Sequence, residues 1–338
     1  MVNIGQCLGL LVVYTLGALM HWRTLSWAFL GINAISAVLC IFLIPETPYY
    51  LVNKYREDEA LAVLKQLRGK HEDVAEEFAE ILQRKKLLDQ RSSSEQAAGL
   101  WSVLTSPSFV KPFLVIGTVY GLSQLGGIGN LSMYMVTVFQ ESGSDLDPYV
   151  CSIIVALART VIACVSSFAL HFLGRRVLFF GSALTISASL ALMGTVAYLK
   201  EFVVVTAEEY EDEGHLVIPD VLYRVLNFIP VISVVVVYSA HSFGYGVVIR
   251  VVIAESFPTE IRSISSSLCL LLANLLLAGT GYLFPTYLEL FGFHGTFWLY
   301  GGITFCVGIY GVIRIPESKG KSLVKMEELY EKKKNGNP

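Results

Sequence analysis

The sequence predicts an all-α membrane protein, a bundle of eight transmembrane helices, and three observations lead to this fold class. Hydrophobic residues make up 54% of the 338 residues, charged residues only 16%, and eight long apolar stretches occupy most of the chain. A soluble protein normally has about a quarter of its residues charged, which excludes a water-soluble globule. The formal net charge of −3 argues against a nucleic-acid partner, because such proteins present a basic face.

The apolar stretches match the thickness of a bilayer. A hydrocarbon core of about 30 Å needs about 20 apolar residues per helix. Their continuous apolar character, without a period of two, favours helices over barrel strands. His21, Trp22 and Arg23 follow the first stretch where a cleavable signal peptide needs small residues, so we expect this stretch to be a transmembrane helix. The stretches lie at roughly 4–20, 25–44, 110–139, 149–172, 177–199, 221–252, 264–287 and 295–314.

The distribution of charge predicts the orientation in the membrane. Residues 51–100 hold nine Lys or Arg and ten Asp or Glu, whereas 140–148 has no basic residue and 200–220 has only Lys200. By the positive-inside rule, 51–100 is cytoplasmic, and so are both ends of the chain. We expect an amphipathic helix that begins at Glu57 and is closed by Gly69, a second helix over about 72–89, and a flexible link at residues 92–94. The six cysteines show no CxxC spacing, so we expect no metal, cofactor or disulfide framework.

Two similar motifs indicate an internal repeat. Residues 45–48 read Pro-Glu-Thr-Pro after the second stretch, and residues 316–320 read Pro-Glu-Ser-Lys-Gly after the eighth. Six stretches separate the motifs, which predicts a repeating unit of six helices. Only two stretches precede the first motif, so a six-plus-six architecture would lack its first four helices here. We therefore expect two last helices of an N-terminal half (1–50), a cytoplasmic helical linker (51–106), a six-helix C-terminal half (107–316) and a cytoplasmic tail (317–338).

Two further motifs complete a recognisable set. Residues 174–176 read Gly-Arg-Arg, and residues 254–262 read Ala-Glu-Ser-Phe-Pro-Thr-Glu-Ile-Arg. With these motifs the chain resembles the sugar porter family of the major facilitator superfamily, and most closely the insect facilitative trehalose/glucose transporters. The resemblance implies helices 5 to 12 of twelve in a plasma-membrane transporter, with trehalose or a hexose as the small-molecule substrate. It also implies a cytoplasmic salt-bridge network, for which solvated interfacial charge is the alternative. The network residues are Arg175, Arg176, Glu255, Arg262, Glu46 and Glu317.

The resemblance also implies substrate-binding positions. Residues 123–130 lie where the family carries Gln-Gln-x-Ser-Gly-x-Asn; Gln124 matches the second Gln, and Asn130 is displaced by one position. The two side chains would point about 240° apart on a regular helix, unless the glycines at 126, 127 and 129 break the helix. Close helix packing is the other explanation for these glycines, and interhelical hydrogen bonds are the alternative role for Gln124 and Asn130. The resemblance adds Ser123, Tyr134, Asn274 and Asn3.

Arg159 lies near the middle of the fourth stretch, where the family has an Asn. A charge at that depth costs several kcal/mol unless it faces water, a carboxylate or carbonyl groups. We therefore expect Arg159 to face a cavity and to bind a substrate oxygen or an anion. Arg250 lies about one turn before Glu255 and the cytoplasm, so we expect it to snorkel or to form a pair.

The leading functional hypothesis is facilitative sugar transport by alternating access. A pathway of this kind needs both halves, so we expect this chain not to transport by itself. The alternative is a non-transporting membrane protein with a sensing or regulatory role, because residues 244–250 lack the two prolines and the Trp of the family's Gly-Pro-x-Pro-x-x-Trp motif. No HExxH, GxSxG or P-loop motif occurs, and we assign no catalytic residue and predict no enzyme activity.

Overall fold

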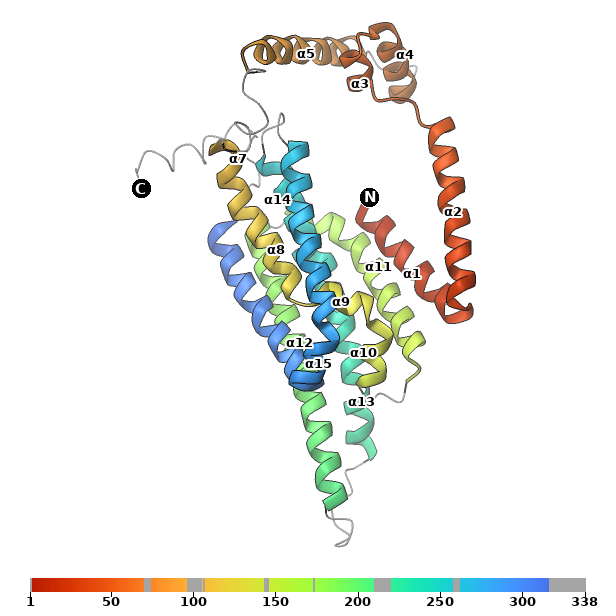
Figure 1. Cartoon of the computed structure of the whole chain (residues 1–338), viewed down its shortest axis with the longest axis vertical. Helices are drawn as coiled ribbons and strands as arrows, with labels where there is room; N and C mark the ends of the chain where they lie inside the picture. The colour runs from red at the N-terminus through yellow and green to blue at the C-terminus, as the bar shows by residue number, and fades with distance from the viewer. Residues whose placement is uncertain are drawn as a thin grey trace, which may run out of the picture. The chain divides into compact units, whose positions relative to one another are not determined.

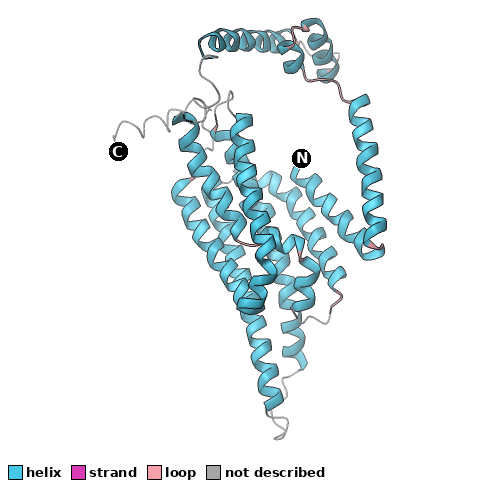
Figure 2. Ribbon diagram, viewed as in Figure 1, coloured by secondary structure: helices cyan, strands magenta, loops and turns pink. Residues whose placement is uncertain are grey.

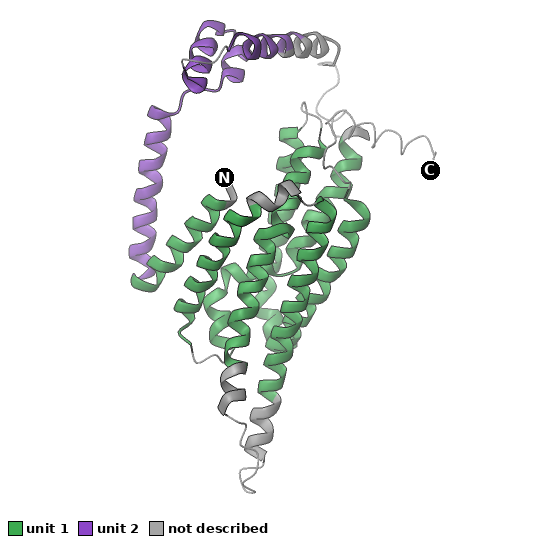
Figure 3. Ribbon diagram, turned by 180° about the vertical axis from the view of Figure 1, so that it is seen from behind, with its two compact units in different colours: residues 1–19, 106–338 green, residues 20–105 purple. Residues whose placement is uncertain are grey.

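The computed structural model describes residues 2–69, 74–95, 105, 107–142, 146–172, 174–209, 220–257 and 262–315. Every regular element in these ranges is a helix (Figure 2), which confirms the all-α class. The chain divides into two compact units (Figure 3). Unit 1 comprises residues 1–19 and 106–338, and unit 2 comprises residues 20–105.

Unit 2 begins with a long apolar helix and continues with three shorter ones. These are α2 (Trp22–Leu43), α3 (Pro48–Asn53), α4 (Glu57–Arg68) and α5 (Ala75–Glu95). The Pro-Glu-Thr-Pro motif starts α3, because the Thr47 hydroxyl accepts a hydrogen bond from the Tyr50 N–H and Pro48 occupies the first turn. The α4 helix has the predicted acidic first turn and ends at Gly69, whose φ is +89°. The expected flexible link at 92–94 is wrong, since these serines belong to α5.

The three short helices of unit 2 enclose a small apolar core. Leu51, Val52, Ala60, Leu64, Val74 and Ile81 are all buried there. Arg68 donates two hydrogen bonds to the Glu77 carboxylate, at 2.9 and 2.7 Å. This guanidinium holds the pKa of Glu77 below its ordinary value. Lys85 donates to the Val52 carbonyl oxygen at 2.6 Å, which ties α5 to α3.

Unit 1 is a helical bundle in which several predicted stretches are bent or divided. Its first helix, α1, lies beside α11 (Figure 1). The third predicted stretch is divided into five pieces, the sixth into three, and the last two are joined as α15, which changes direction at Gly292 (φ +68°). The elements are α1 (Val2–Leu19), α7 (Pro107–Pro112), η1 (Phe113–Gly117), α8 (Thr118–Leu125), α9 (Ile128–Met133), α10 (Met135–Glu141), α11 (Pro148–Phe172), α12 (Arg175–Glu209), α13 (Asp220–Ala240), η2 (His241–Tyr245), α14 (Gly246–Ser256) and α15 (Arg262–Arg314).

The described helices are suited to a bilayer. Five of them are long and apolar enough to cross a membrane, and residues 4–19 and 109–125 form shorter apolar helices. One of the five, α15, has 53 residues, more than twice the length that one crossing requires. Small residues bring α12 and α15 close together, because a Cβ on Gly308 would lie 2.8 Å from that of Ala183.

The glycines of the third stretch do break the helix, which is one of the two explanations that the sequence left open. The α8 helix ends at Leu125, and α9 starts at Ile128 after Gly127, which has a φ of +75°. This left-handed conformation is one that side chains other than glycine rarely adopt. The break changes the direction in which the polar residues before and after it point.

Candidate functional site

A polar cavity of about 200 Å³ lies inside unit 1, where six helical segments meet. Its walls come from α1, α8, α9, α11, the α13–η2 junction and α14, so residues far apart in the sequence converge on it. Ten of its fourteen lining residues have polar side chains, which is unusual for the interior of a membrane bundle. The lining residues are Gln6, Tyr120, Ser123, Gln124, Ile128, Gly129, Ser132, Arg159, Tyr238, His241, Tyr245, Gly246, Ile249 and Arg250.

The last turn of α8 supplies two of the predicted binding residues. Ser123 is 5% exposed, and its hydroxyl donates to the Tyr120 carbonyl oxygen at 2.6 Å. The Gln124 amide donates to the Ser123 hydroxyl at 3.2 Å and to the same carbonyl oxygen at 3.4 Å. Both side chains are therefore held by their own helix and line the cavity together.

Arg159 lies in the middle of α11 and lines the cavity, as its midspan position predicted. Its guanidinium carbon lies 5.2 Å from the centre of the Tyr238 ring, in a cation–π contact. Its Nε is buried and has no hydrogen-bond partner among the described residues. A central arginine costs about 2.5–3.5 kcal/mol, and a desolvated cation–π contact returns about 2 kcal/mol. The ring alone does not offset the cost of this charge.

Tyr238 is fixed in place by a chain of hydroxyl groups. Its hydroxyl donates to the Ile128 carbonyl oxygen at 3.1 Å and lies 2.8 Å from the Ser132 hydroxyl. Tyr14 donates to the Ser132 carbonyl oxygen at 2.9 Å, which attaches α1 to the same point. The ring beneath Arg159 is therefore held by α9, to which Tyr14 attaches α1.

The η2 and α14 segments contribute polar groups that the sequence analysis did not assign to a site. Arg250 donates to Gln6 Oε1 at 2.7 Å and to the Gly246 carbonyl oxygen at 3.1 Å, so it forms a pair across 244 positions of the chain. The Tyr245 hydroxyl and His241 Nδ1 are buried and have no hydrogen-bond partner in the described part of the chain. Their polarity within an apolar stretch was the available signal. Segments of π-helix such as η2 are frequent at functional sites.

The other predicted binding residues lie outside this cavity. Asn130 is fully buried; its amide donates to the Tyr300 hydroxyl at 3.1 Å, and Thr280 donates to its Oδ1 at 3.4 Å. Tyr134 donates to the Gly281 carbonyl oxygen at 3.2 Å. These contacts join α9 and the start of α10 to α15. Asn274 is exposed on α15, and the side chain of Asn3 lies outside the described residues.

The predicted network of charges is partly visible at one end of unit 1. Arg175, the first residue of α12, forms an ion pair with Glu255 of α14 at 3.3 Å. Arg176 donates to the Ile315 carbonyl oxygen at 2.6 Å, and Arg262 donates to that of Phe257 at 3.3 Å. Glu46 is exposed in unit 2, and Glu317 lies outside the described residues.

We expect the Arg175–Glu255 pair to show a coupling free energy of about 0.5–1 kcal/mol, because both side chains are partly exposed. A double-mutant cycle with Arg175→Gln and Glu255→Gln, read from unfolding of the purified protein, measures this value. The pair Arg56–Glu59, whose side chains are more than half exposed, is the matched control and should show weaker coupling. Strictly additive effects at Arg175 and Glu255 would contradict the expected pairing.

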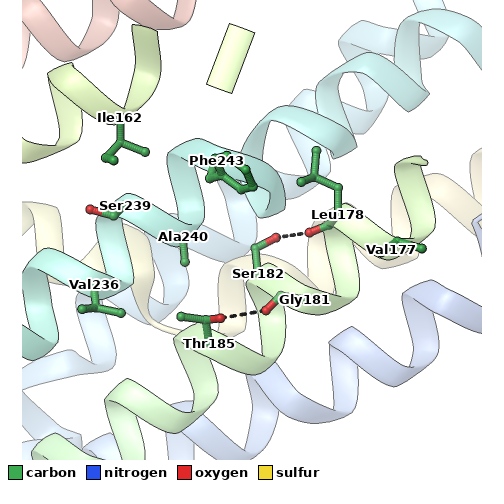
Figure 4. A pocket seen from close by; sticks show the side chains of 10 residues that line it. All are labelled: Ile162, Val177, Leu178, Gly181, Ser182, Thr185, Val236, Ser239, Ala240 and Phe243. Carbon is green, nitrogen blue, oxygen red and sulfur yellow. Dashed lines mark hydrogen bonds between the residues drawn. The ribbon is translucent and has the colours of Figure 1, made fainter. Parts of the chain in front are cut away.

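A second cavity, of about 450 Å³, has a different character (Figure 4). Val177, Val236 and Phe243 contribute to its apolar wall between α11, α12 and the α13–η2 segment. The two hydroxyl groups that Figure 4 connects by dashed lines are satisfied within α12, Ser182 by the Leu178 carbonyl and Thr185 by the Gly181 carbonyl. This cavity suits hydrocarbon, whereas the smaller polar cavity suits a hydroxylated or charged ligand.

Comparisons with known proteins identify relatives of this chain. The honeybee protein named facilitated trehalose transporter Tret1 (Apis mellifera ligustica) is 30% identical over 326 residues, covering 95% of this chain and 60% of that protein. The Aedes aegypti protein of the same name is 29% identical over 324 residues, covering 95% of this chain and 37% of that protein. The chain therefore spans less than two thirds of the length of either relative.

Solved structures support the fold. The proton:xylose symporter XylE of the major facilitator superfamily, bound to 6-bromo-6-deoxy-D-glucose, matches with a TM-score of 0.71 at 19% identity, covering 97% of this chain and 66% of that chain. The inward-open xylose transporter XylE from E. coli gives a TM-score of 0.68 at 18% identity, covering 96% and 64%. The fold is thus a partial major facilitator bundle. The family model described as "Sugar (and other) transporter" matches residues 1–330, and the chain belongs to this family of integral membrane proteins.

Proposed function

We propose that the polar cavity is the sugar-binding site of a plasma-membrane transporter that works by alternating access, with trehalose or a hexose as substrate. The observation that supports this most strongly is the meeting of several hydrogen-bonding side chains in one cavity within an apolar bundle. Sugars need both donors and acceptors, and transporters of this architecture bind substrate near the midplane, where helices are broken. The names of the relatives, facilitated trehalose transporters, agree with this class of substrate.

The lining residues offer a sugar different hydrogen-bond donors and acceptors. The Gln124 amide offers both a donor and an acceptor, and the unpartnered Tyr245 hydroxyl and His241 Nδ1 add further capacity. A sugar hydroxyl placed against these groups satisfies atoms that otherwise stay buried without partners. Because each unsatisfied buried group costs about 1–3 kcal/mol, the ligand gains affinity by relieving that cost.

The ion pair between Arg175 and Glu255 is a contact that can form and break during a transport cycle. It joins the start of α12 to α14, the helix that also carries the cavity residue Arg250. We infer that this pair, with Arg176, Arg262, Glu46 and Glu317, holds the cytoplasmic end closed in one state and separates in the other. Both ends of the chain would then lie in the cytoplasm.

Replacing Gln124 by leucine is expected to weaken sugar binding by roughly tenfold, as loss of a neutral hydrogen bond of about 1.5 kcal/mol implies. Equilibrium binding of radiolabelled glucose and trehalose to the purified protein measures the change. Gln140→Leu, at an exposed position on α10, is the matched control and should bind like the parent protein.

Two outcomes would redirect this proposal. Undiminished binding of both sugars by Gln124→Leu would remove the cavity from the sugar site. Proteoliposome uptake, measured in parallel, separates transport from binding. Sugar binding without uptake is the result expected of this chain alone, and uptake by it would contradict the expectation that the pathway needs both halves.

A further inference from the structure

We propose that the natural ligand of this cavity is a sugar that carries a carboxylate, and that Arg159 is the residue that binds the carboxylate. The inference rests on the proposed function, because it names the substrate class of the same site. It differs from the neutral sugars that the names of the relatives suggest.

Arg159 offers hydrogen-bonding capacity that the described protein does not use. It makes no ion pair or hydrogen bond with the described residues, and its buried Nε lacks an acceptor. The contact with the Tyr238 ring, at 5.2 Å, supplies no oxygen or nitrogen acceptor to the guanidinium N–H groups. A guanidinium presents five donors in a plane, and a carboxylate accepts two of them in parallel. A single sugar hydroxyl would leave most of this capacity unused.

The sign of the charge around Arg159 also favours an anion. Arg250 brings a second guanidinium to the cavity wall, and the described lining residues include no Asp or Glu. Within the low dielectric of a membrane bundle, a positive cavity attracts an anionic ligand far more strongly than it would in water.

The remaining unpartnered groups account for the sugar part of the ligand. Tyr245 is 1% exposed, its hydroxyl has no partner among the described residues, and His241 Nδ1 is in the same situation. Both line the cavity that Arg159 lines. The volume of about 200 Å³ corresponds to six or seven waters at about 30 Å³ each. Arg159 would therefore fix the carboxylate while the hydroxyls of a small ligand reach Tyr245, His241 and Gln124.

Glucose and glucuronate form a suitable pair of probes, because they share one ring and differ only in the group at C6. Calorimetric titration of the full 338-residue chain in detergent should show glucuronate binding about tenfold more tightly than glucose. In Arg159→Gln the ratio of the two dissociation constants should fall to about one. Arg314→Gln removes an exposed arginine outside the cavity, and this control should keep the preference.

The results of this experiment test separately the preference for a carboxylate, the role of Arg159 and the proposed function. Glucose binding as tight as, or tighter than, glucuronate binding to the unmodified chain overturns the proposal, whether or not the variants fold. A glucuronate preference that survives in folded Arg159→Gln overturns the assignment to Arg159. Failure of the unmodified chain to bind either sugar contradicts the proposed function itself, and the inference falls with it.

Discussion

Replacing Gly127 by alanine is expected to destabilise unit 1 by about 2–5 kcal/mol. The residue has a φ of +75°, and a left-handed conformation costs a side chain about 1–2 kcal/mol. A Cβ at this position would also overlap the ring of Tyr300, which is buried, and overpacking of a core costs about 1–3 kcal/mol. Thermal unfolding of the detergent-solubilised protein, followed by fluorescence-detected size exclusion, measures the loss.

Gly279 provides the matched control for this substitution. It lies on α15 with open space around its Cα, so an added methyl group meets no other atom. Gly279→Ala should therefore be neutral or should stabilise the protein by up to about 1 kcal/mol. If the Gly127 and Gly279 variants unfold at the same temperature as the parent protein, the helix break does not depend on the left-handed glycine.

The break at Gly127 links the fold to the candidate site. It ends α8 one residue after Gln124 and starts α9 four residues before Ser132, and both residues line one cavity. On an uninterrupted helix, residues eight apart lie about 80° from each other and two turns apart. Tyr238, the ring that supports Arg159, donates to the carbonyl oxygen of Ile128, the residue that starts α9. The start of α9 thus helps to position the ring in the cavity wall.

Much of this arrangement was predictable from the sequence because it depends on local or solvation physics. Glycines at 126, 127 and 129 raised a helix break as one of two explanations, and a midspan charge predicted that Arg159 faces a cavity, since lipid excludes an isolated guanidinium. The start of α4 and its end at Gly69 followed from helix-capping preferences. In each case the cause lies within a few residues, or in the difference between water and hydrocarbon.

The remaining features depend on contacts that no local pattern encodes. Arg250 was expected to snorkel or to form a pair, but Gln6 lies 244 positions away and nothing near Arg250 identifies it as the acceptor. The sequence left a helix break open, but it gave no direction in which the break turns Asn130. That direction is set by Tyr300, 170 positions further along the chain.

At Asn130, a long-range contact that no local pattern indicates determines the role of the side chain. Replacement by leucine, which is of similar size, is expected to destabilise the protein by about 1–3 kcal/mol, because it removes the donor to the buried Tyr300 hydroxyl. Thr280 keeps a second acceptor, the Leu277 carbonyl oxygen at 3.0 Å, so its loss is smaller. The unfolding assay used for Gly127 measures this change.

The same variant separates the two roles that the sequence left open for Asn130. If Asn130 bridges α9 and α15, then Asn130→Leu lowers stability while the folded fraction keeps its sugar affinity. Gln124→Leu should show the opposite pattern, weaker binding with little loss of stability, because its amide donates hydrogen bonds to Tyr120 and Ser123 within α8. Weakened binding in an Asn130→Leu protein of normal stability would instead place Asn130 in contact with the sugar. The cavity that carries the proposed function would then extend past the helix break toward α15.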